Sequence, residues 1–165
     1  MEGLDHIIPG VDLGDEHAPI IARAGYHGGP MDDASRQRIE QFQRLVQLDP
    51  EGEISHYGLA KAYFDCGTLA EGRGDAPEAA SMFDEAIREY SKVLAIKPDY
   101  AACFLFLGLS QQKSGMRDAA MRTYQDGMGV AQRNGDLHLR KRMWDQVQIL
   151  EGKAVAPPPG PQSLH

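Results

Sequence analysis

Cysteine is scarce in this sequence, and its scarcity excludes two kinds of site. The 165 residues contain only Cys66 and Cys103, too few for a disulfide framework. Two thiolates also cannot complete the four ligands of a structural zinc site by themselves. Both cysteines fall within predicted helices, where a buried free thiol packs as a small hydrophobic group. We therefore expect both thiols to be inert.

Long hydrophobic runs are absent as well. No stretch reaches the roughly 18 apolar residues that a membrane-spanning helix needs. The N-terminal residues also lack the basic start and the apolar segment of a secretory signal. We therefore expect a cytoplasmic protein with no direct membrane span.

Basic residues are almost missing from the N-terminal leader. Residues 1–34 carry seven acidic side chains and a single basic one, Arg23, whereas residues 35–153 are close to neutral. Nucleic-acid binding requires a basic surface, so the leader argues against a nucleic-acid partner. A plainer interpretation is that the leader is only a solvated segment.

Catalytic motifs are absent too: there is no Gly-rich phosphate loop, nucleophile elbow or paired-histidine metal motif. Ligand-type side chains gather at Asp12, Asp15, Glu16 and His17. That stretch is rich in Gly and Pro, whereas a metal site needs fixed geometry. We interpret His56 as a packed core histidine. The sequence thus predicts no enzyme, no catalytic residue, no metal and no cofactor.

Hydrophobic residues recur at helical spacing between the two ends of the chain. Pro50 ends the first predicted helix, because the residue before proline avoids the helical region. Asp75 has the signature of an N-cap, with Glu78 three residues later, and Gly115 that of a helix end. The predicted helices are residues 34–47, 53–67, the segment from the cap Asp75 to the stop at Lys97-Pro98, 101–114, 117–131 and 136–150.

Two helix ends resemble each other, at residues 45–50 and 94–99, and a similar pattern follows each. The first copy has His56, Leu59, Ala60, Tyr63, Gly67, Ala86, Tyr90, Val93 and Pro98; the second has Phe104, Leu107, Gly108, Gly115, Ala120, Tyr124 and Gly127. This pattern resembles the tetratricopeptide repeat, although Gln111, Gly127 and Gln132 replace the usual tyrosine, alanine and proline. The resemblance implies an all-α fold, a short α-solenoid of about six helices in tetratricopeptide-type hairpins, with irregular N- and C-terminal tails.

The first copy departs from the family in length. Pro50 and Pro98 are 48 residues apart, whereas the family period is about 34. We expect the extra residues to form a longer loop at Leu69–Gly74 and to lengthen the helix that begins at Asp75. The predicted organisation is an acidic leader (1–34), a repeat domain (35–150) and a Pro-rich tail (151–165); the domain comprises a half repeat (34–50), a repeat (51–98) with an insertion (68–85), a second repeat (99–132) and a capping helix (136–150).

The resemblance also implies where a partner binds. In this family the first helix of each pair lines a concave groove that holds a peptide or a partner helix. By the repeat register, the groove residues are Ile54, Tyr57, Lys61, Phe64, Leu105, Leu109 and Gln112, with Phe106 as a further candidate. The set of lysine, asparagine and arginine that grips a terminal carboxylate in one subclass is missing. The groove is instead apolar and aromatic, which is typical of an interaction site.

Three functions fit this pattern. The leading prediction is an adaptor or scaffold subunit that binds an apolar helix or extended segment of a protein partner. A second is a self-assembling structural protein, a homo-oligomer in which the leader of one copy fills the groove of the next. A third is a chaperone-like accessory factor. The apolar pairs Ile7-Ile8 and Ile20-Ile21 could equally cover the groove within one chain.

Overall fold

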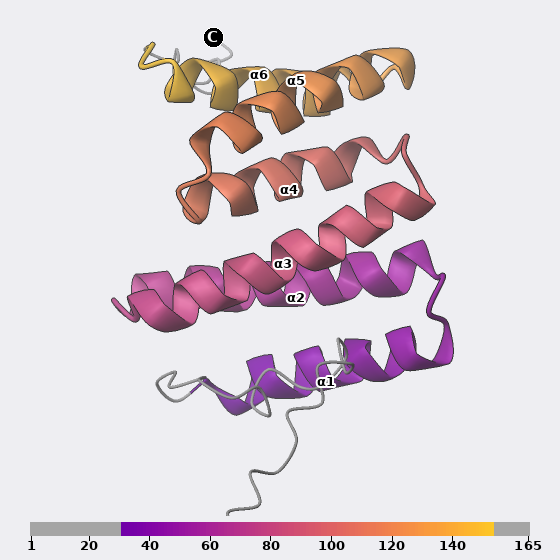
Figure 1. Cartoon of the computed structure of the whole chain (residues 1–165), viewed down its shortest axis with the longest axis vertical. Helices are drawn as coiled ribbons and strands as arrows, with labels where there is room; N and C mark the ends of the chain where they lie inside the picture. The colour runs from indigo at the N-terminus through magenta and orange to yellow at the C-terminus, as the bar shows by residue number, and fades with distance from the viewer. Residues whose placement is uncertain (1–30, 154–165) are drawn as a thin grey trace, which may run out of the picture.

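The computed structural model describes residues 31–153, and every regular element in that range is a helix. The elements are α1 (Asp33–Leu48), α2 (Glu53–Gly72), α3 (Ala76–Ile96), α4 (Ala101–Lys113), α5 (Arg117–Arg133) and α6 (Leu137–Leu150). Consecutive helices run antiparallel and stack in chain order, from α1 at the bottom of Figure 1 to α6 at the top. The predicted all-α, repeat-like stack of about six helices is confirmed.

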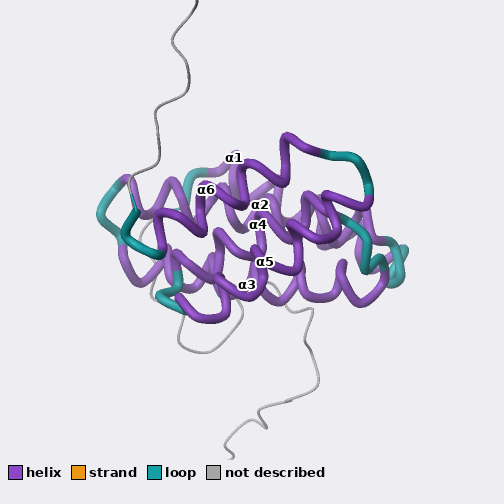
Figure 2. Tube along the Cα trace, turned by 90° about the horizontal axis from the view of Figure 1, so that it is seen from above, coloured by secondary structure: helices purple, strands orange, loops and turns teal. Residues whose placement is uncertain are grey.

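The stack bends toward one side. Among the described residues, each helix packs against the next one, and α4 also contacts both α2 and α6, whereas α3 and α5 do not touch each other. Seen from above, α3 and α5 lie on one side of α2 and α4 (Figure 2). The row α2, α4 and α6 is therefore on the inside of the bend, and we call the surface of this row the inner face.

Two kinds of turn connect the helices. α1 and α3 end at Asp49 and Lys97, which precede prolines and have extended φ values of −136° and −131°, as the residue before proline requires. The other four helices end at a glycine with φ between 74° and 78°, and the next N–H bonds back to a carbonyl in the last turn. These glycines are Gly74, Gly115, Gly135 and Gly152. The helix ends predicted at Pro50, Pro98, Gly115 and Gly135 are thus confirmed.

The predicted loop at Leu69–Gly74 is wrong. α2 continues to Gly72, so only Arg73, Gly74 and Asp75 connect it to α3. The extra residues of the first hairpin lengthen both helices instead, to 20 residues in α2 and 21 in α3, against 13 in α4 and 17 in α5. Gly67 lies inside α2 because the Phe83 ring occupies the space of a side chain: an added Cβ would be 2.9 Å from that ring.

Aspartates begin three of the helices. The Asp75 carboxylate accepts a hydrogen bond from the Glu78 N–H at 3.1 Å, and Asp136 accepts one from the Leu139 N–H at 3.0 Å. Asp32 does the same for Ser35 at 2.9 Å. Each bond satisfies one of the N–H groups that a helix N-terminus leaves unpaired. The caps predicted at Asp75 and Asp136 are therefore confirmed.

The hydrophobic core runs along the stack between the helices. Tyr63, Tyr90 and Tyr124 are buried in it, as are Cys66 and Cys103. Burial raises the pKa of each thiol to about 12, which suppresses the reactive thiolate. Within residues 31–153, no helix combines the length and hydrophobicity that crossing a bilayer requires.

Candidate functional site

The inner face of α2 carries hydrophobic side chains that the core does not fully cover. Ile54 is 76% exposed, and Tyr57, Lys61 and Phe64 are partly exposed. Their spacing of three and four residues places all four on one side of the helix. These four predicted groove residues therefore share a solvent-accessible surface.

An aromatic cluster, which we define as Tyr57, Phe64, Tyr90, Tyr100 and Phe106, joins α2 to α3 and α4. Tyr57 stacks on Tyr100 with ring centroids 4.9 Å apart. Phe106, from α4, lies 5.6 Å from Phe64 and 6.4 Å from Tyr57 in edge-to-face geometry. Tyr90 packs 5.6 Å from Tyr57. Such contacts restrict the rings, so the partly exposed ones form a fixed hydrophobic surface.

Cations border this aromatic cluster. The Lys61 ammonium lies 5.3 Å from the Phe106 ring centroid and 5.8 Å from that of Phe64. The Lys97 ammonium lies 5.6 Å from the Tyr100 ring centroid. These distances allow cation–π attraction. Lys61 also pairs with Asp65.

The pKa of the Tyr57 hydroxyl reflects burial and the charges around it. Burial, reinforced by Tyr100, raises the pKa of Tyr57 to about 12, whereas the positive charge of Arg142 acts to lower it. Arg142 belongs to α6, two helices along the row, and its side chain is exposed. The inner face of α2 and α4 is therefore aromatic, and the positive charge of Arg142 on α6 acts on it.

The residues predicted to line the groove on α4 are buried or partly buried. Leu105 is only 1% exposed and belongs to the core shared with Tyr124 and Met143. The prediction that it lines an open groove is wrong, because α6 packs against α4 there. Leu109 packs partly buried against the same core. Gln112 is partly buried and accepts a hydrogen bond from the Tyr124 hydroxyl at 3.0 Å.

Two residues of the surface are missing from the predicted set. Tyr100 precedes α4 and was not in the repeat register, although an aromatic after Lys97-Pro98 is a visible signal. Arg142 lies on α6, and no local pattern in the sequence tells which side of that helix is turned toward α2.

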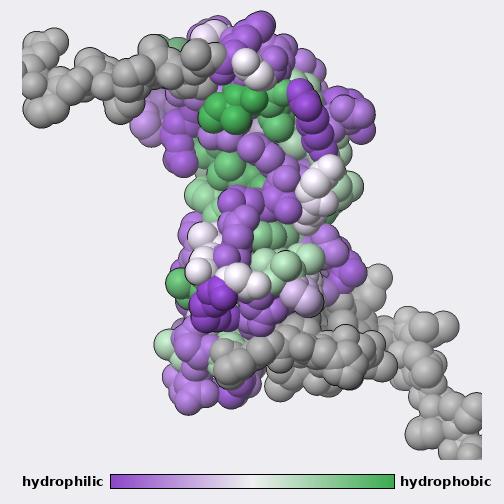
Figure 3. Space-filling view, turned by 90° about the vertical axis from the view of Figure 1, so that its left-hand side faces the viewer, coloured by the Kyte–Doolittle hydropathy of each residue, from purple (hydrophilic) through white to green (hydrophobic). Residues whose placement is uncertain are grey.

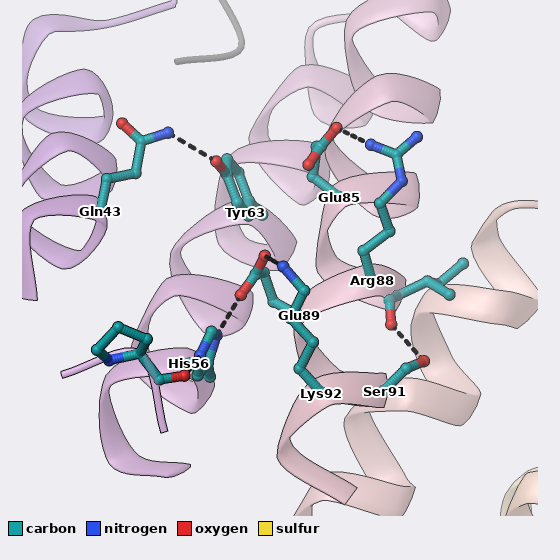
Figure 4. Close-up of polar contacts among 10 residues, drawn as sticks. Gln43, His56, Tyr63, Glu85, Arg88, Glu89, Ser91 and Lys92 are labelled. Carbon is teal, nitrogen blue, oxygen red and sulfur yellow. Dashed lines mark hydrogen bonds and ion pairs between the residues drawn. The ribbon is translucent and has the colours of Figure 1, made fainter. Parts of the chain in front are cut away.

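A buried polar network lies behind the surface, where α2 begins (Figure 4). His56 is 3% exposed, as predicted for a core histidine. Its Nε2 lies 2.8 Å from the Pro50 carbonyl oxygen and must donate, because a carbonyl only accepts. Its Nδ1 lies 2.6 Å from Glu89 Oε2, so one proton lies between them. The other oxygen of Glu89 accepts from Lys92 at 3.1 Å.

The sequence reasoning missed three buried carboxylates on one side of α3. Glu78, Glu85 and Glu89 are at most 6% exposed. Each has a basic partner: Arg73 at 2.6 Å from Glu78, Arg88 beside Glu85, and the His56 and Lys92 pair on Glu89. Their spacing of seven and four residues places the three carboxylates on one side of a helix, and this is the feature of the sequence that could have identified them. With every charge paired, this stripe is a structural element rather than a reactive site.

A hollow of about 200 Å³ lies at the α2–α3 turn. It is lined by Glu71, Gly74, Ala76, Ala79, Ala80, Phe83 and Lys113. The Lys113 ammonium closes one side by pairing with Glu71 at 2.6 Å. On the side of the stack where this turn lies, hydrophobic surface is divided into patches by polar side chains (Figure 3). The hollow is small and supplies only this one ion pair.

Among residues 31–153, no three His, Cys, Asp or Glu side chains gather as metal ligands would. The ligand-type residues Asp12, Asp15, Glu16 and His17 lie outside the described residues. The Ile7-Ile8 and Ile20-Ile21 pairs and the proline-rich tail also lie outside them.

Comparison with known proteins supports the fold. No protein-family model and no curated protein matches the sequence. The chain is similar to the solution structure of protein BPP2914 from Bordetella parapertussis, with a TM-score of 0.55 and 20% identity over 69% of this chain and 87% of that one. At this level of identity the likeness concerns the fold alone.

Proposed function

We propose that this chain is a protein-interaction adaptor or scaffold of the tetratricopeptide type. Its inner face binds an apolar helix or an extended segment of another protein. The observation that carries the proposal is the accessible row of Ile54, Tyr57 and Phe64. Two of these residues, Tyr57 and Phe64, belong to the aromatic cluster, whose ring contacts fix the shape of the row. Exposed apolar surface of this kind marks interaction sites, and ordered aromatic rings serve as anchors.

The expected complex is of modest strength. Only three helices, α2, α4 and α6, contribute to the face, so a single segment should bind with a Kd of about 1 μM, near the weak end of specific interfaces. We place the adaptor in the cytoplasm, in keeping with its two free thiols, because disulfides are rare in that compartment.

The test uses one surface substitution and a matched control. Ile54→Glu places a charge on the inner face, and Leu137→Glu places one on α6; both side chains are largely exposed, at 76% and 63%, so neither change should unfold the protein. A partner is captured from the source organism and its binding segment is titrated by calorimetry. We expect Ile54→Glu to abolish binding and Leu137→Glu to leave it intact. Equal binding by both variants would refute the inner-face site.

A second candidate function, self-assembly, is favoured by the end of the stack. Leu137, Trp144 and Ile149 of α6 are each about half exposed or more, and no further helix of residues 31–153 covers them. In solenoids such end surfaces need a polar cap or a neighbour. Sedimentation at rising concentration tests this: a monomer at every concentration contradicts it, and a dimer lost in Leu137→Glu supports it.

A further inference from the structure

The inner face has a chemical preference beyond being apolar. Its rings are bordered by the ammonium groups of Lys61 and Lys97, and the exposed Arg142 of α6 adds a positive charge that acts on Tyr57. Two carboxylates lie among these cations: Asp65 pairs with Lys61 and with Arg38 at 3.1 Å, and the negative charge of the partly exposed Glu53 acts on Tyr100. Three cations against two carboxylates leave the face with a positive balance. A segment that alternates aliphatic and acidic side chains would match both features, because aliphatic groups cover rings and carboxylates meet cations.

The chain itself contains such a segment. Residues 1–30 carry five acidic side chains and one basic side chain. The acids alternate with aliphatic residues along Leu4-Asp5, Ile7-Ile8 and Val11-Asp12-Leu13. By contrast, residues 154–165 have no acidic side chain. Only the N-terminal leader therefore has the charge that complements the inner face.

The leader is also long enough and is attached at a suitable place. Thirty residues can span roughly 100 Å when extended, whereas the row α2, α4, α6 covers about 20 Å at ordinary helix spacing. The leader joins the fold at Met31, which is 6% exposed and packs in the core beside α2.

We propose that residues 1–30 bind the inner face of their own chain and act as an internal competitor of the external partner. This rests on the proposed function, because it takes the inner face to be a peptide-binding surface. Release of the leader would then be the step that exposes Ile54, Tyr57 and Phe64 to a partner.

A spin label on the full-length chain tests the proposal. Gly10→Cys places a nitroxide in the leader, and the native thiols stay unlabelled because both are buried. In the ¹⁵N-labelled chain we expect the amide signals of Gly58, Lys61 and Leu109 to lose most of their intensity, and to regain it when the nitroxide is reduced. Unchanged signals at these positions, or losses confined to other helices, would overturn the proposal.

Two controls sharpen the result. The first control mixes spin-labelled chain without ¹⁵N with ¹⁵N-enriched chain that carries no spin label, and this mixture should show no loss of signal. A loss there would by itself mean that the leader of a second copy is the occupant, which overturns binding within one chain. Arg142→Glu should restore the signals, whereas Arg140→Glu, about 200° away round α6, should not. Capture of a partner, compared between Ile54→Glu and Leu137→Glu, does not depend on the leader. A leader that does not bind would therefore leave the adaptor proposal standing.

Discussion

At the scale of single residues, Tyr90 and Tyr124 form a natural pair. Both side chains are completely buried, but the Tyr124 hydroxyl donates to Gln112, whereas the Tyr90 hydroxyl has no hydrogen-bond partner among residues 31–153. A buried polar group without a partner costs free energy. We predict that Tyr90→Phe leaves the free energy of unfolding unchanged or raises it by about 1 kcal/mol, and that Tyr124→Phe lowers it by about 1 kcal/mol. Urea denaturation measures both, and a larger loss in Tyr90→Phe would contradict the assignment.

His56 and Glu89 give the second prediction at this scale. Glu89 is buried and has two partners, His56 and Lys92; removing His56 leaves one carboxylate oxygen of Glu89 without its hydrogen bond in the core, which costs about 2 kcal/mol. We therefore expect His56→Phe to lower the free energy of unfolding by about that amount, although phenylalanine fits the size of the site. Adding Glu89→Leu should recover most of the loss. Arg44→Ala is the control, because its exposed pair with Glu40 contributes less than about 1 kcal/mol; no recovery in the double variant would contradict the account.

At the scale of the helices, local chemistry predicted most ends but not the packing. Pro50, Pro98 and Asp75 act on their own backbone neighbourhood, so their effect was visible in the sequence. Gly67 was misleading, because a glycine that admits the Phe83 ring looks the same in sequence as one that ends a helix. Leu105 was misassigned for a related reason: whether α6 covers it depends on a contact between distant parts of the chain.

Close helix packing gives the prediction for this scale. A Cβ on Gly108 would be 2.3 Å from the Tyr124 ring, so Gly108→Ala must push α4 away from α5. We expect it to lower the free energy of unfolding by about 2 kcal/mol, as overpacking does. Gly129→Ala is the matched control in α5, where the nearest atom is a flexible arginine nitrogen at 3.5 Å. Since alanine favours the helix by about 1 kcal/mol, this variant should be more stable than wild type; thermal unfolding compares the two.

At the scale of the whole molecule, the bend of the stack creates the candidate site. The inner face draws Tyr57 from α2 and Phe106 from α4, which lie far apart in the sequence, and the charge of Arg142 on α6 acts on Tyr57. The repeat register identified the α2 residues because they share one helix. It missed the cation from α6, since the direction of a helix face is set by the packing of the entire row.

Stability at alkaline pH tests the integrity of the core that runs through this row. The thiols of Cys66 and Cys103 have an ordinary pKa of 9.0, and burial raises both to about 12 in the folded chain. Above pH 9 the unfolded chain therefore loses these protons first, which favours unfolding. Stability present below pH 9 is lost as the pH rises toward 12. At pH 10 each thiol accounts for about 1.4 kcal/mol, or about 3 kcal/mol together.

The measurement is urea denaturation at pH 7, 9 and 10 under reducing conditions. Between pH 9 and 10 the two thiols should together cost wild type about 2 kcal/mol. The buried tyrosines, whose pKa values burial raises from 10.0, begin to contribute near pH 10 as well, but equally in wild type and in a cysteine-free variant. The variant Cys66→Ala with Cys103→Ala is less stable at pH 7, because it leaves small cavities, but its stability should fall by about 2 kcal/mol less than that of wild type over the same interval. A parallel fall in both proteins would assign the alkaline loss to groups other than the buried thiols, and the core around α2 and α4 would then have to admit water.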